Sequence, residues 1–226
     1  MSAKAGLKQF SDKGARAIMT ELEQLLYRKV MQGRKAGELT REQKKAALKY
    51  LMFLKQKRCG KIKGRGCADG RKQRLYKTKE ETSSPTISIE ALFLTCIVDA
   101  LEHRCVATCD IPGAFMQADM DELIHVKLEG ELATLLIRLD PTYQEYLMTE
   151  HGKPVIYAEL SKALYRTLQA ALLFWKNLTE FLTELGFEPN PYDSCMMNKD
   201  INGKQCTIGW HVDDLKISHL KIQLST

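Results

Sequence analysis

The sequence predicts an α+β fold with a largely antiparallel sheet packed on helices, and three observations lead to that prediction. Apolar residues recur at helical spacing in several stretches, alternating runs typical of strands lie between them, and turn signals separate neighbouring strands near the end. Hydrophobic residues make up 44% of the 226 residues, enough for a substantial core. The chain shows no internal repeat and no long linker.

Two helices are predicted near the N-terminus. Residues 15–31 place Ile18, Leu22 and Leu25 at helical spacing. The residues TREQ, 40–43, have the spacing of a capping box, so a second helix is predicted over residues 41–57. Its cationic end closes on a glycine, as helix C-termini prefer.

The remaining elements alternate between strands and helices. The residues ADG lie between two short alternating runs within residues 61–77, which predicts a hairpin. The other predicted elements, in order, are an apolar helix over 89–101, a buried strand over 105–116 that ends in a Pro-Gly bend, a solvated turn at Asp119, Asp121 and Glu122, strands over 122–130 and 155–160, a long helix over 163–185, and three strands over 194–220 joined by an NG turn and a DD pair.

Sequence composition indicates in which cellular compartment the protein resides. The seven cysteines include no CxxC pair, which favours a reducing environment over a disulfide framework or structural zinc. No run of about 18 apolar residues exists to span a membrane, and the N-terminal residues lack the apolar core of a secretory signal. We therefore expect an intracellular protein that is not secreted.

Charge is divided unevenly along the chain. Residues 1–79 hold 23 Lys and Arg against 6 Asp and Glu, a net charge of +17, and residues 80–226 hold 11 against 22, a net charge of −11. This basic arm favours an anionic partner such as nucleic acid or nucleotide, but a solvated helical face would have the same composition.

The stretch GWHVDDLKIS, residues 209–218, places Asp213 and Asp214 inside an apolar pair of strands. Two carboxylates about 4 Å apart repel by roughly 4 kcal/mol at an effective dielectric constant near 20. The pair therefore either caps a turn in water or holds a cation. Asp110 ends another predicted strand, and three aspartates that converge from strand ends would select Mg²⁺ or Mn²⁺, two of which can promote phosphoryl transfer.

Four motifs occur in one order along the chain: CDIPGAFMQADMDELIHVKLEG, LSKALYRTLQAALLFWKNL, LGFEPNPYDSCM and WHVDDLKIS. With similar gaps they resemble the reverse transcriptase of copia-type retrotransposons. The upstream stretch KGRGCADGRKQRLYK is similar to the basic fingers hairpin of that family, and SSPTISIEALFLTCIVDA is similar to the helix before its first catalytic strand. The resemblance covers about residues 15–226.

The resemblance implies an RNA-directed DNA polymerase core that uses two Mg²⁺ or Mn²⁺ ions to transfer a nucleotide from a dNTP to a primer 3′-OH. Asp110 and Asp213 match the catalytic carboxylates that bridge the ions, and Asp214 matches the adjacent subsidiary acid. The residues that match nucleotide-binding positions are Ile111 to Ala114 through backbone N–H groups, Phe115 as the aromatic gate against a ribose 2′-OH, Gln169, and Arg74 with Lys63 or Arg65 on the fingers.

The resemblance also implies an architecture of fingers and palm preceded by N-terminal helices. We expect a basic helical region over residues 1–58, and fingers with a partial palm over residues 59–226. The thumb and RNase H domain of the family do not fit in the 12 residues after Asp214, which predicts an incomplete or degraded copy truncated after VDD. The implied partners are an RNA template, a DNA primer and a dNTP, the implied location is cytoplasmic, in a virus-like particle, or nuclear, and self-association is left open.

Four residues depart from the family pattern. His211, near the primer end, stands where the family mostly has Tyr, Arg166 replaces a Gly near the template, and Ala171-Leu172 replaces a Pro-Arg pair. Two alternatives to the polymerase stay open: a catalytically dead remnant that binds nucleic acid, and a metal-dependent phosphohydrolase. Phe115 and Gln169 argue against the hydrolase, which would need neither.

Overall fold

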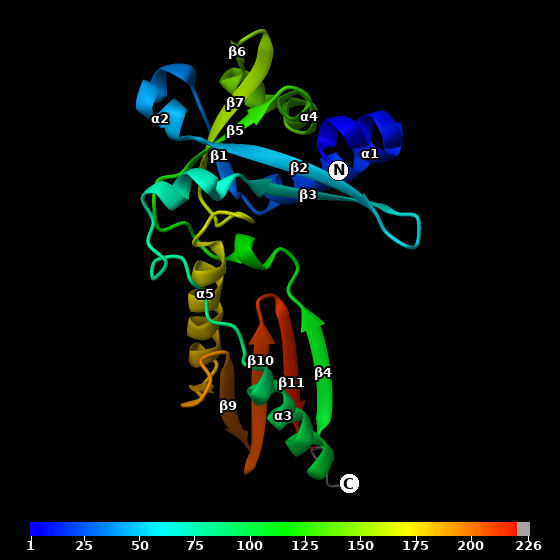
Figure 1. Cartoon of the computed structure of the whole chain (residues 1–226), viewed down its shortest axis with the longest axis vertical. Coiled ribbons are helices and arrows are strands. Elements are labelled where there is room, and N and C mark those ends of the chain that lie inside the picture. Colours follow the sequence, from blue (N-terminus) through cyan, green and yellow to red (C-terminus); the bar gives the residue numbers. More distant parts are fainter. Residues whose placement is uncertain (221–226) are drawn as a thin grey trace. The chain divides into compact units, whose positions relative to one another are not determined.

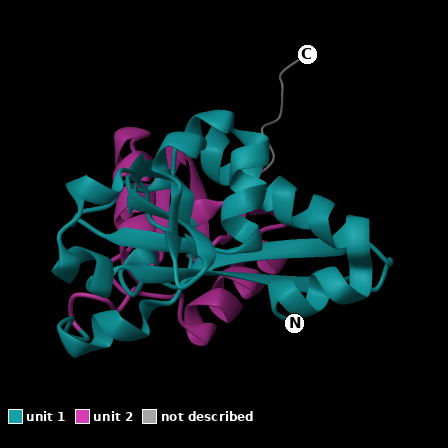
Figure 2. Ribbon diagram, turned by 90° about the horizontal axis from the view of Figure 1, so that it is seen from above, with its two compact units in different colours: residues 1–79, 115–170 teal, residues 80–114, 171–226 magenta. Residues whose placement is uncertain are grey.

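A computed structural model describes residues 1–220 and divides the chain into two compact units that are interleaved in sequence. Unit 1 consists of residues 1–79 and 115–170, and unit 2 contains residues 80–114 and the chain from residue 171 onward (Figure 2). Each unit combines helices with a sheet, so the predicted α+β class is confirmed. The last six residues of the expected 59–226 region lie outside the described residues.

Unit 1 is built on a six-stranded sheet in the order β1-β7-β5-β2-β3, with β6 paired to β7. All pairs are antiparallel except β2 with β5. Its strands are β1 (Met31–Arg34), β2 (Leu48–Gln56), β3 (Ile62–Ala68), β5 (His125–Glu129), β6 (Met148–Glu150) and β7 (Lys153–Leu160). Its helices are α1 (Ala3–Tyr27), α2 (Arg41–Ala46) and α4 (Glu131–Leu139), with the 3-10 helices η1 (Ala36–Glu38), η2 (Gly70–Leu75), η3 (Ala114–Gln117) and η4 (Pro141–Tyr146).

Helix α1 covers one face of the β2–β3 hairpin. Ile18 and Leu22 on this helix are fully buried, as their helical spacing predicts. On β3, a Cβ at Gly64 would lie 2.6 Å from the carbonyl oxygen of Ala17, so only glycine lets the helix approach this closely. The opposite face of the hairpin is therefore left for other contacts.

Unit 2 is built on a five-stranded antiparallel sheet in the order β4-β11-β10-β9-β8 (Figure 1). Trp210 and Met197 from this sheet are 2% and 1% exposed and belong to its core. The elements are the helices α3 (Ile89–Leu101) and α5 (Ala170–Glu184), and the strands β4 (Cys105–Asp110), β8 (Glu188–Pro189), β9 (Met196–Ile201), β10 (Lys204–His211) and β11 (Asp214–His219).

Two predictions in unit 2 are confirmed closely. The apolar helix over 89–101 is α3, and the Ser88 hydroxyl accepts a hydrogen bond from the Ala91 N–H at its start. The NG turn joins β9 to β10, with Asn202 at φ 56° and Gly203 at φ 73°. Positive φ at both turn residues matches the twist of a two-residue hairpin, which is why Asn-Gly is favoured there.

The predicted helix over 41–57 is wrong beyond its first turns. The capping box is present, because Thr40 and Gln43 exchange hydrogen bonds, but α2 ends at Ala46. Strand β2 follows, and its residues alternate between buried and exposed from Leu48 onward. Pairing with β3 and β5 therefore overrides the helical pattern.

The hairpin predicted around ADG and the buried strand predicted over 105–116 also need correction. The hairpin is β2–β3, and ADG instead starts η2, where the Asp69 carboxylate accepts from the Arg71 N–H. Strand β4 pairs only with β11, and all six of its residues are exposed. Its apolar run therefore belongs to an edge strand.

Other boundaries shift as well. Helix α1 starts at Ala3, well before the predicted residue 15, and contains a kink at Ser11. Helix α5 starts at Ala170, well after the predicted residue 163, and helix α4 was not predicted. Within residues 1–220, no helix is long and apolar enough to cross a membrane.

Candidate active site

The DD pair lies at the turn between β10 and β11. These strands are paired up to His211 and Asp214, so Val212 and Asp213 form a two-residue turn. Val212 has φ 59°, in the left-handed region that a β-branched residue rarely enters. Glycine is the usual residue at such a position of a hairpin turn, so the backbone at this point is strained.

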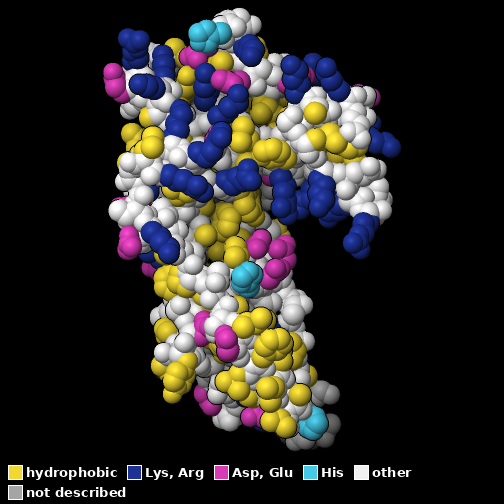
Figure 3. All heavy atoms as spheres, in the orientation of Figure 1, with side chains coloured by type: hydrophobic (Ala, Val, Ile, Leu, Met, Phe, Trp, Pro, Cys, Tyr) yellow, Lys and Arg dark blue, Asp and Glu magenta, His cyan; other side chains and the backbone are white. Residues whose placement is uncertain are grey.

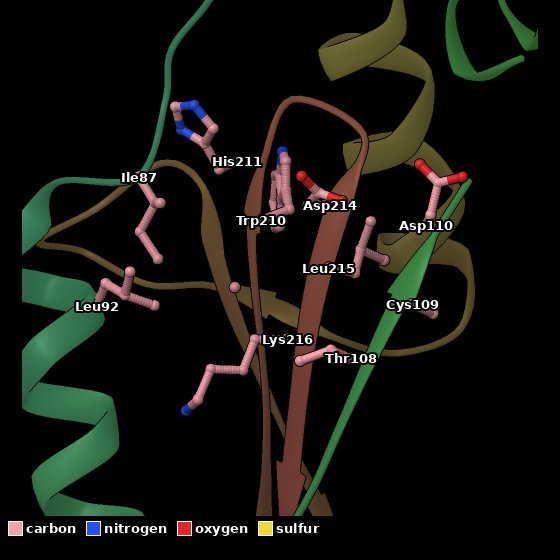
Figure 4. Close-up of a pocket in the computed structure, with 11 residues that line it drawn as sticks. Ile87, Leu92, Thr108, Cys109, Asp110, Trp210, His211, Asp214, Leu215 and Lys216 are labelled. Atoms are coloured by element: carbon pink, nitrogen blue, oxygen red, sulfur yellow. The ribbon is translucent and has the colours of Figure 1, made fainter. Parts of the chain in front are cut away.

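Pairing of β4 with β11 places Asp110 directly opposite Asp214. Next to them, the Ile111 N–H donates to the Asp213 carbonyl at 3.0 Å, so the Asp110–Asp214 pair is of the type without its own hydrogen bonds. In such pairs the Cα atoms are typically about 4.5 Å apart, and the side chains lie on one face of the sheet. Figure 4 shows both carboxylates at the end of the sheet where the turn lies.

These two carboxylates have no partner among the described residues. Within residues 1–220, neither Asp110 nor Asp214 makes a hydrogen bond or ion pair through its side chain. Like charges directly opposite each other on neighbouring strands destabilise a sheet, and a bound cation would remove that cost. The carboxylate oxygens are the hard ligands that Mg²⁺ prefers.

The three aspartates do not form a ready-made metal site in the described residues. No group of three or more His, Cys, Asp or Glu side chains in the described part of the chain could hold a metal ion as the side chains stand. The Asp213 carbonyl accepts the hydrogen bond from the Ile111 N–H. A site with all three carboxylates therefore requires side-chain rearrangement among Asp110, Asp213 and Asp214.

A hollow of about 470 Å³ lies beside the paired aspartates on the same sheet (Figure 4). Its apolar lining includes Leu92, Trp210 and Leu215, and its polar groups include Asp110, Asp214 and His211. His211, the residue expected near the primer end, is exposed there.

Lys216 lines this hollow, and its side chain extends to α3 (Figure 4). Its ammonium group donates to Thr95 Oγ1 at 3.0 Å and forms an ion pair with the buried Asp99. The Asp99 Oδ1 atom has no hydrogen-bond partner in the described structure. Sequence analysis did not identify this pair, because a Lys and an Asp that are 117 positions apart carry no local signal.

The stretch after Asp110 forms the predicted Pro-Gly bend, but two of its backbone N–H groups are already engaged. The Ile111 N–H donates to Asp213, and the Ala114 N–H donates to the Ile111 carbonyl at 3.1 Å. Pro112 has no N–H to offer. Binding of a triphosphate by these groups, as the resemblance implies, would require those bonds to be exchanged.

On unit 1, Phe115 lies against another aromatic ring. The ring centroids of Phe115 and Tyr165 are 4.6 Å apart, with the planes tilted by 53°. The Phe115 side chain is half-buried. Its expected role as a gate for the sugar stays a prediction.

The basic candidates of unit 1 lie on two elements. Lys63 and Arg65 are on the face of β3 opposite α1, and Arg74 is exposed on η2. Register places Lys55 opposite Lys63, and Phe53 opposite Arg65. Figure 3 shows Lys and Arg side chains spread over the visible face of unit 1.

Arg166 occupies a glycine-like backbone position. Its φ is 69°, so the glycine that the family has at this position would suit the backbone conformation. The Arg166 guanidinium lies 5.6 Å from the centroid of the exposed Phe53 ring, which adds a fourth cation to the face formed by Lys55, Lys63 and Arg65. Arg166 therefore belongs to the basic face.

Gln169 is not exposed to solvent. Its side chain is 1% exposed and is hydrogen-bonded to Gln73 and Glu122, which sequence analysis did not identify as site residues. Glu122 was expected in a solvated turn, but it also pairs with Lys77. No sequence signal pointed to these contacts, because they join segments 96 and 47 positions apart.

A protein-family model described as reverse transcriptase (RNA-dependent DNA polymerase) matches residues 35–224 of this chain. A curated protein from Saccharomyces cerevisiae (strain ATCC 204508 / S288c), described as glycolipid 2-alpha-mannosyltransferase, is 29% identical over 86 residues. That alignment covers 37% of this chain and 20% of the yeast protein. The chain thus spans a fifth of the length of that relative.

Proposed function

We propose that this chain, which belongs to the reverse transcriptase (RNA-dependent DNA polymerase) family, is the polymerase region of a copia-type retrotransposon enzyme. The proposed reaction is transfer of a nucleotide from a dNTP to the 3′-OH of a DNA primer, directed by an RNA template. The proposed cofactors are two Mg²⁺ or Mn²⁺ ions.

The observation that carries this proposal is the Asp110–Asp214 pair at the end of the unit 2 sheet. Two carboxylates opposite each other, with no partner within residues 1–220, are a poor arrangement for a sheet and a good one for a divalent cation. The residues that would hold the ions are Asp110, Asp213 and Asp214. Bound Mg²⁺ would supply the charge neutralisation that phosphoryl transfer needs.

Backbone strain at the β10–β11 turn also supports a catalytic role for the aspartates beside it. Val212 keeps a left-handed backbone although its side chain disfavours it, and such outliers cluster at functional sites. In this proposal the two-residue turn fixes the backbone of Asp213 next to Asp214. The carboxylates are then held before any substrate arrives, which reduces reorganisation during the reaction.

The basic face of β2–β3 supports binding of nucleic acid or of the triphosphate. Lys55 and Lys63 are like charges placed opposite each other, a pairing that an anion would stabilise. Phe53, between Arg65 and Arg166, offers an aromatic surface on which a base can stack. Cations with an interleaved aromatic ring are typical of surfaces that bind single-stranded nucleic acid.

Within this proposal we assign the acidic site of unit 2 to the palm and the basic face of unit 1 to the fingers. The further roles proposed are contact with the primer end for His211, contact with the template for Arg166, and selection of the sugar for Phe115. The division into residues 1–58 and 59–226 also stays a prediction.

A second candidate function is nucleic-acid binding without catalysis. One observation favours it: within residues 1–220 the three aspartates are not gathered into a metal-binding group. Such a protein would keep the basic face of unit 1 and would bind nucleic acid with no need for a divalent ion.

Incorporation of a single nucleotide separates the two candidates. A primed RNA template would be incubated with Mg²⁺ or Mn²⁺ and one labelled dNTP, with wild-type protein and the Asp110→Asn, Asp213→Asn and Asp121→Asn variants. The polymerase proposal expects template-directed incorporation by wild type and Asp121→Asn, whose exposed carboxylate serves as the matched control. Binding of the primed template without incorporation under any metal condition would favour the second candidate.

A further inference from the structure

Two glutamine side chains are buried in the part of unit 1 that the proposed function gives to the nucleotide. Gln73 on η2 is 0% exposed, and Gln169 is 1% exposed. Burying an amide without hydrogen bonds costs several kcal/mol by transfer data, so buried amides are normally paired. The two amides form hydrogen bonds with each other, with the Leu168 N–H and with the Glu122 carboxylate.

The contacts form one continuous chain of hydrogen bonds. Gln73 Oε1 accepts from the Leu168 N–H at 3.0 Å, and Gln73 Nε2 donates to Gln169 Oε1 at 2.8 Å. Gln169 Nε2 donates to Glu122 Oε1 at 2.6 Å. Lys77 closes the chain at a distance of 2.7 Å from Glu122 Oε2.

This network fixes the orientation of the Gln169 amide. Glu122 is ion-paired with Lys77, so its carboxylate only accepts hydrogen bonds. The nitrogen of Gln169 must therefore point to Glu122, which leaves its oxygen for Gln73. Each end of the amide already makes a hydrogen bond inside unit 1, and Gln169 is 1% exposed, so almost none of the amide is open to a ligand.

The same network joins segments that carry candidate substrate-binding cations. Arg74 follows Gln73 on η2, and Arg166 precedes Gln169 in the neighbouring loop. The two segments touch closely, because a Cβ at Gly70 would lie 2.2 Å from the Arg166 carbonyl oxygen. Fixing Gln73 against Gln169 therefore also fixes the backbones from which both arginines project.

We propose that Gln73, Glu122 and Gln169 are positioning residues that act as one unit, and that Gln169 orients the basic η2 turn without contacting the nucleotide itself. This inference rests on the proposed function, because it assumes that unit 1 binds a nucleoside triphosphate. It differs from the role that the resemblance implies for Gln169, which is direct contact near the template and the nucleotide.

A charge-swap cycle tests the network. In Gln169→Glu, a second carboxylate replaces the amide nitrogen that donates to Glu122, so two carboxylates would meet in a largely buried site. In the double variant Glu122→Gln/Gln169→Glu, the new amide at position 122 can donate to the new carboxylate, and Gln73 Nε2 can still donate to it. The matched control is Gln144→Glu, which adds the same charge at an exposed glutamine of unit 1.

Two measurements are made on each variant: the urea midpoint of unfolding, and the affinity for thymidine triphosphate by calorimetry in Mg²⁺. We expect Gln169→Glu to lower the midpoint and to weaken binding at least tenfold. The double variant should recover both, with affinity within about threefold of wild type, and Gln144→Glu should change neither.

A double variant that regains its urea midpoint but not its affinity would show that the Gln169 amide contacts the nucleotide, which overturns the inference. Additive losses in the urea midpoint would also overturn it, because they would mean that the residues do not act as a unit. Failure of the proposed function looks different: the wild-type protein itself would bind no thymidine triphosphate.

Discussion

Two residues with a strained backbone are candidate site residues or lie next to one. Val212 precedes Asp213 in the β10–β11 turn, and Arg166 lies in the loop that leads to Gln169. Both have positive φ, although neither residue type favours it. Each therefore gives a test in which only the backbone preference of the side chain is changed.

Replacing Val212 with Gly should stabilise the protein by roughly 1 kcal/mol, because Gly adopts the left-handed conformation without strain. Val212→Ala is the control, since it removes the β-branch but keeps a Cβ, and it should gain less. Denaturant unfolding of the three proteins measures the difference. If Val212→Gly is less stable than Val212→Ala, the turn is not strained in the way described.

Arg166→Gly should be more stable than Arg166→Ala by roughly 1 kcal/mol. Both variants lose the contact of the guanidinium with the Phe53 ring, but only Gly relieves the positive φ. Thermal unfolding of both variants at the same pH checks this. Equal midpoints would indicate that the arginine backbone relaxes out of the left-handed region.

Among the helices and strands, those whose conformation is set by nearby residues are predicted best from the sequence. Helix α3 was predicted with its observed bounds, because its apolar run is a local signal. Strand β2 was predicted as a helix, because an apolar-rich run such as LKYLMFLKQ fits either period. Its strand conformation depends on β3 and β5, and β5 lies far along the chain.

In the candidate site, too, residues with a local sequence signal were predicted and long-range contacts were not. Asp110 and Asp214 were placed at converging strand ends from their positions after or within apolar runs, and the register brings them opposite each other. The contacts of Gln73 and Glu122 could not be predicted, since they exist only after distant segments meet. The exposed edge position of β4 was missed because CVATC is as apolar as a central strand.

A polar pair, Lys216 with Asp99, joins α3 to the unit 2 sheet, which gives an element-scale prediction. Lys216→Ala should destabilise the protein by about 3 kcal/mol, because it leaves the buried Asp99 carboxylate without its counter-charge. Lys176→Ala, which removes an exposed lysine of α5, should cost no more than about 0.5 kcal/mol.

The double variant Asp99→Leu/Lys216→Met should recover much of the loss, because it removes both buried charges together. Urea unfolding of the single and double variants measures the recovery. A Lys216→Ala protein as stable as Lys176→Ala would show that the pair does not hold α3 on the sheet.

At the scale of the whole molecule, the separation of charge predicts how nucleic acid binds. Affinity for a primed RNA template should fall with salt by about 0.7–0.9 log units per log unit of salt for each phosphate neutralised. Lys63→Gln/Arg65→Gln should therefore lower the slope by about 1.4–1.8, since two contacts are lost.

The matched control for that slope is Lys153→Gln, which removes an exposed lysine at the start of β7. Its slope should equal that of wild type. Fluorescence anisotropy between 50 and 200 mM salt gives the slopes. An unchanged slope in the double variant would show that the exposed face of β3 does not contact phosphates.

The central claim is that the aspartates opposite each other at the β10–β11 turn form a cation site, and the dependence of stability on divalent ions tests it most directly. In EDTA, Asp110→Asn should be more stable than wild type by roughly 0.5–1 kcal/mol, because one of two opposed like charges is gone. In Mn²⁺ at about 100 times the wild-type dissociation constant, wild type should gain about 2.7 kcal/mol and the order should reverse. The same order of stability in EDTA and in Mn²⁺ would contradict the claim.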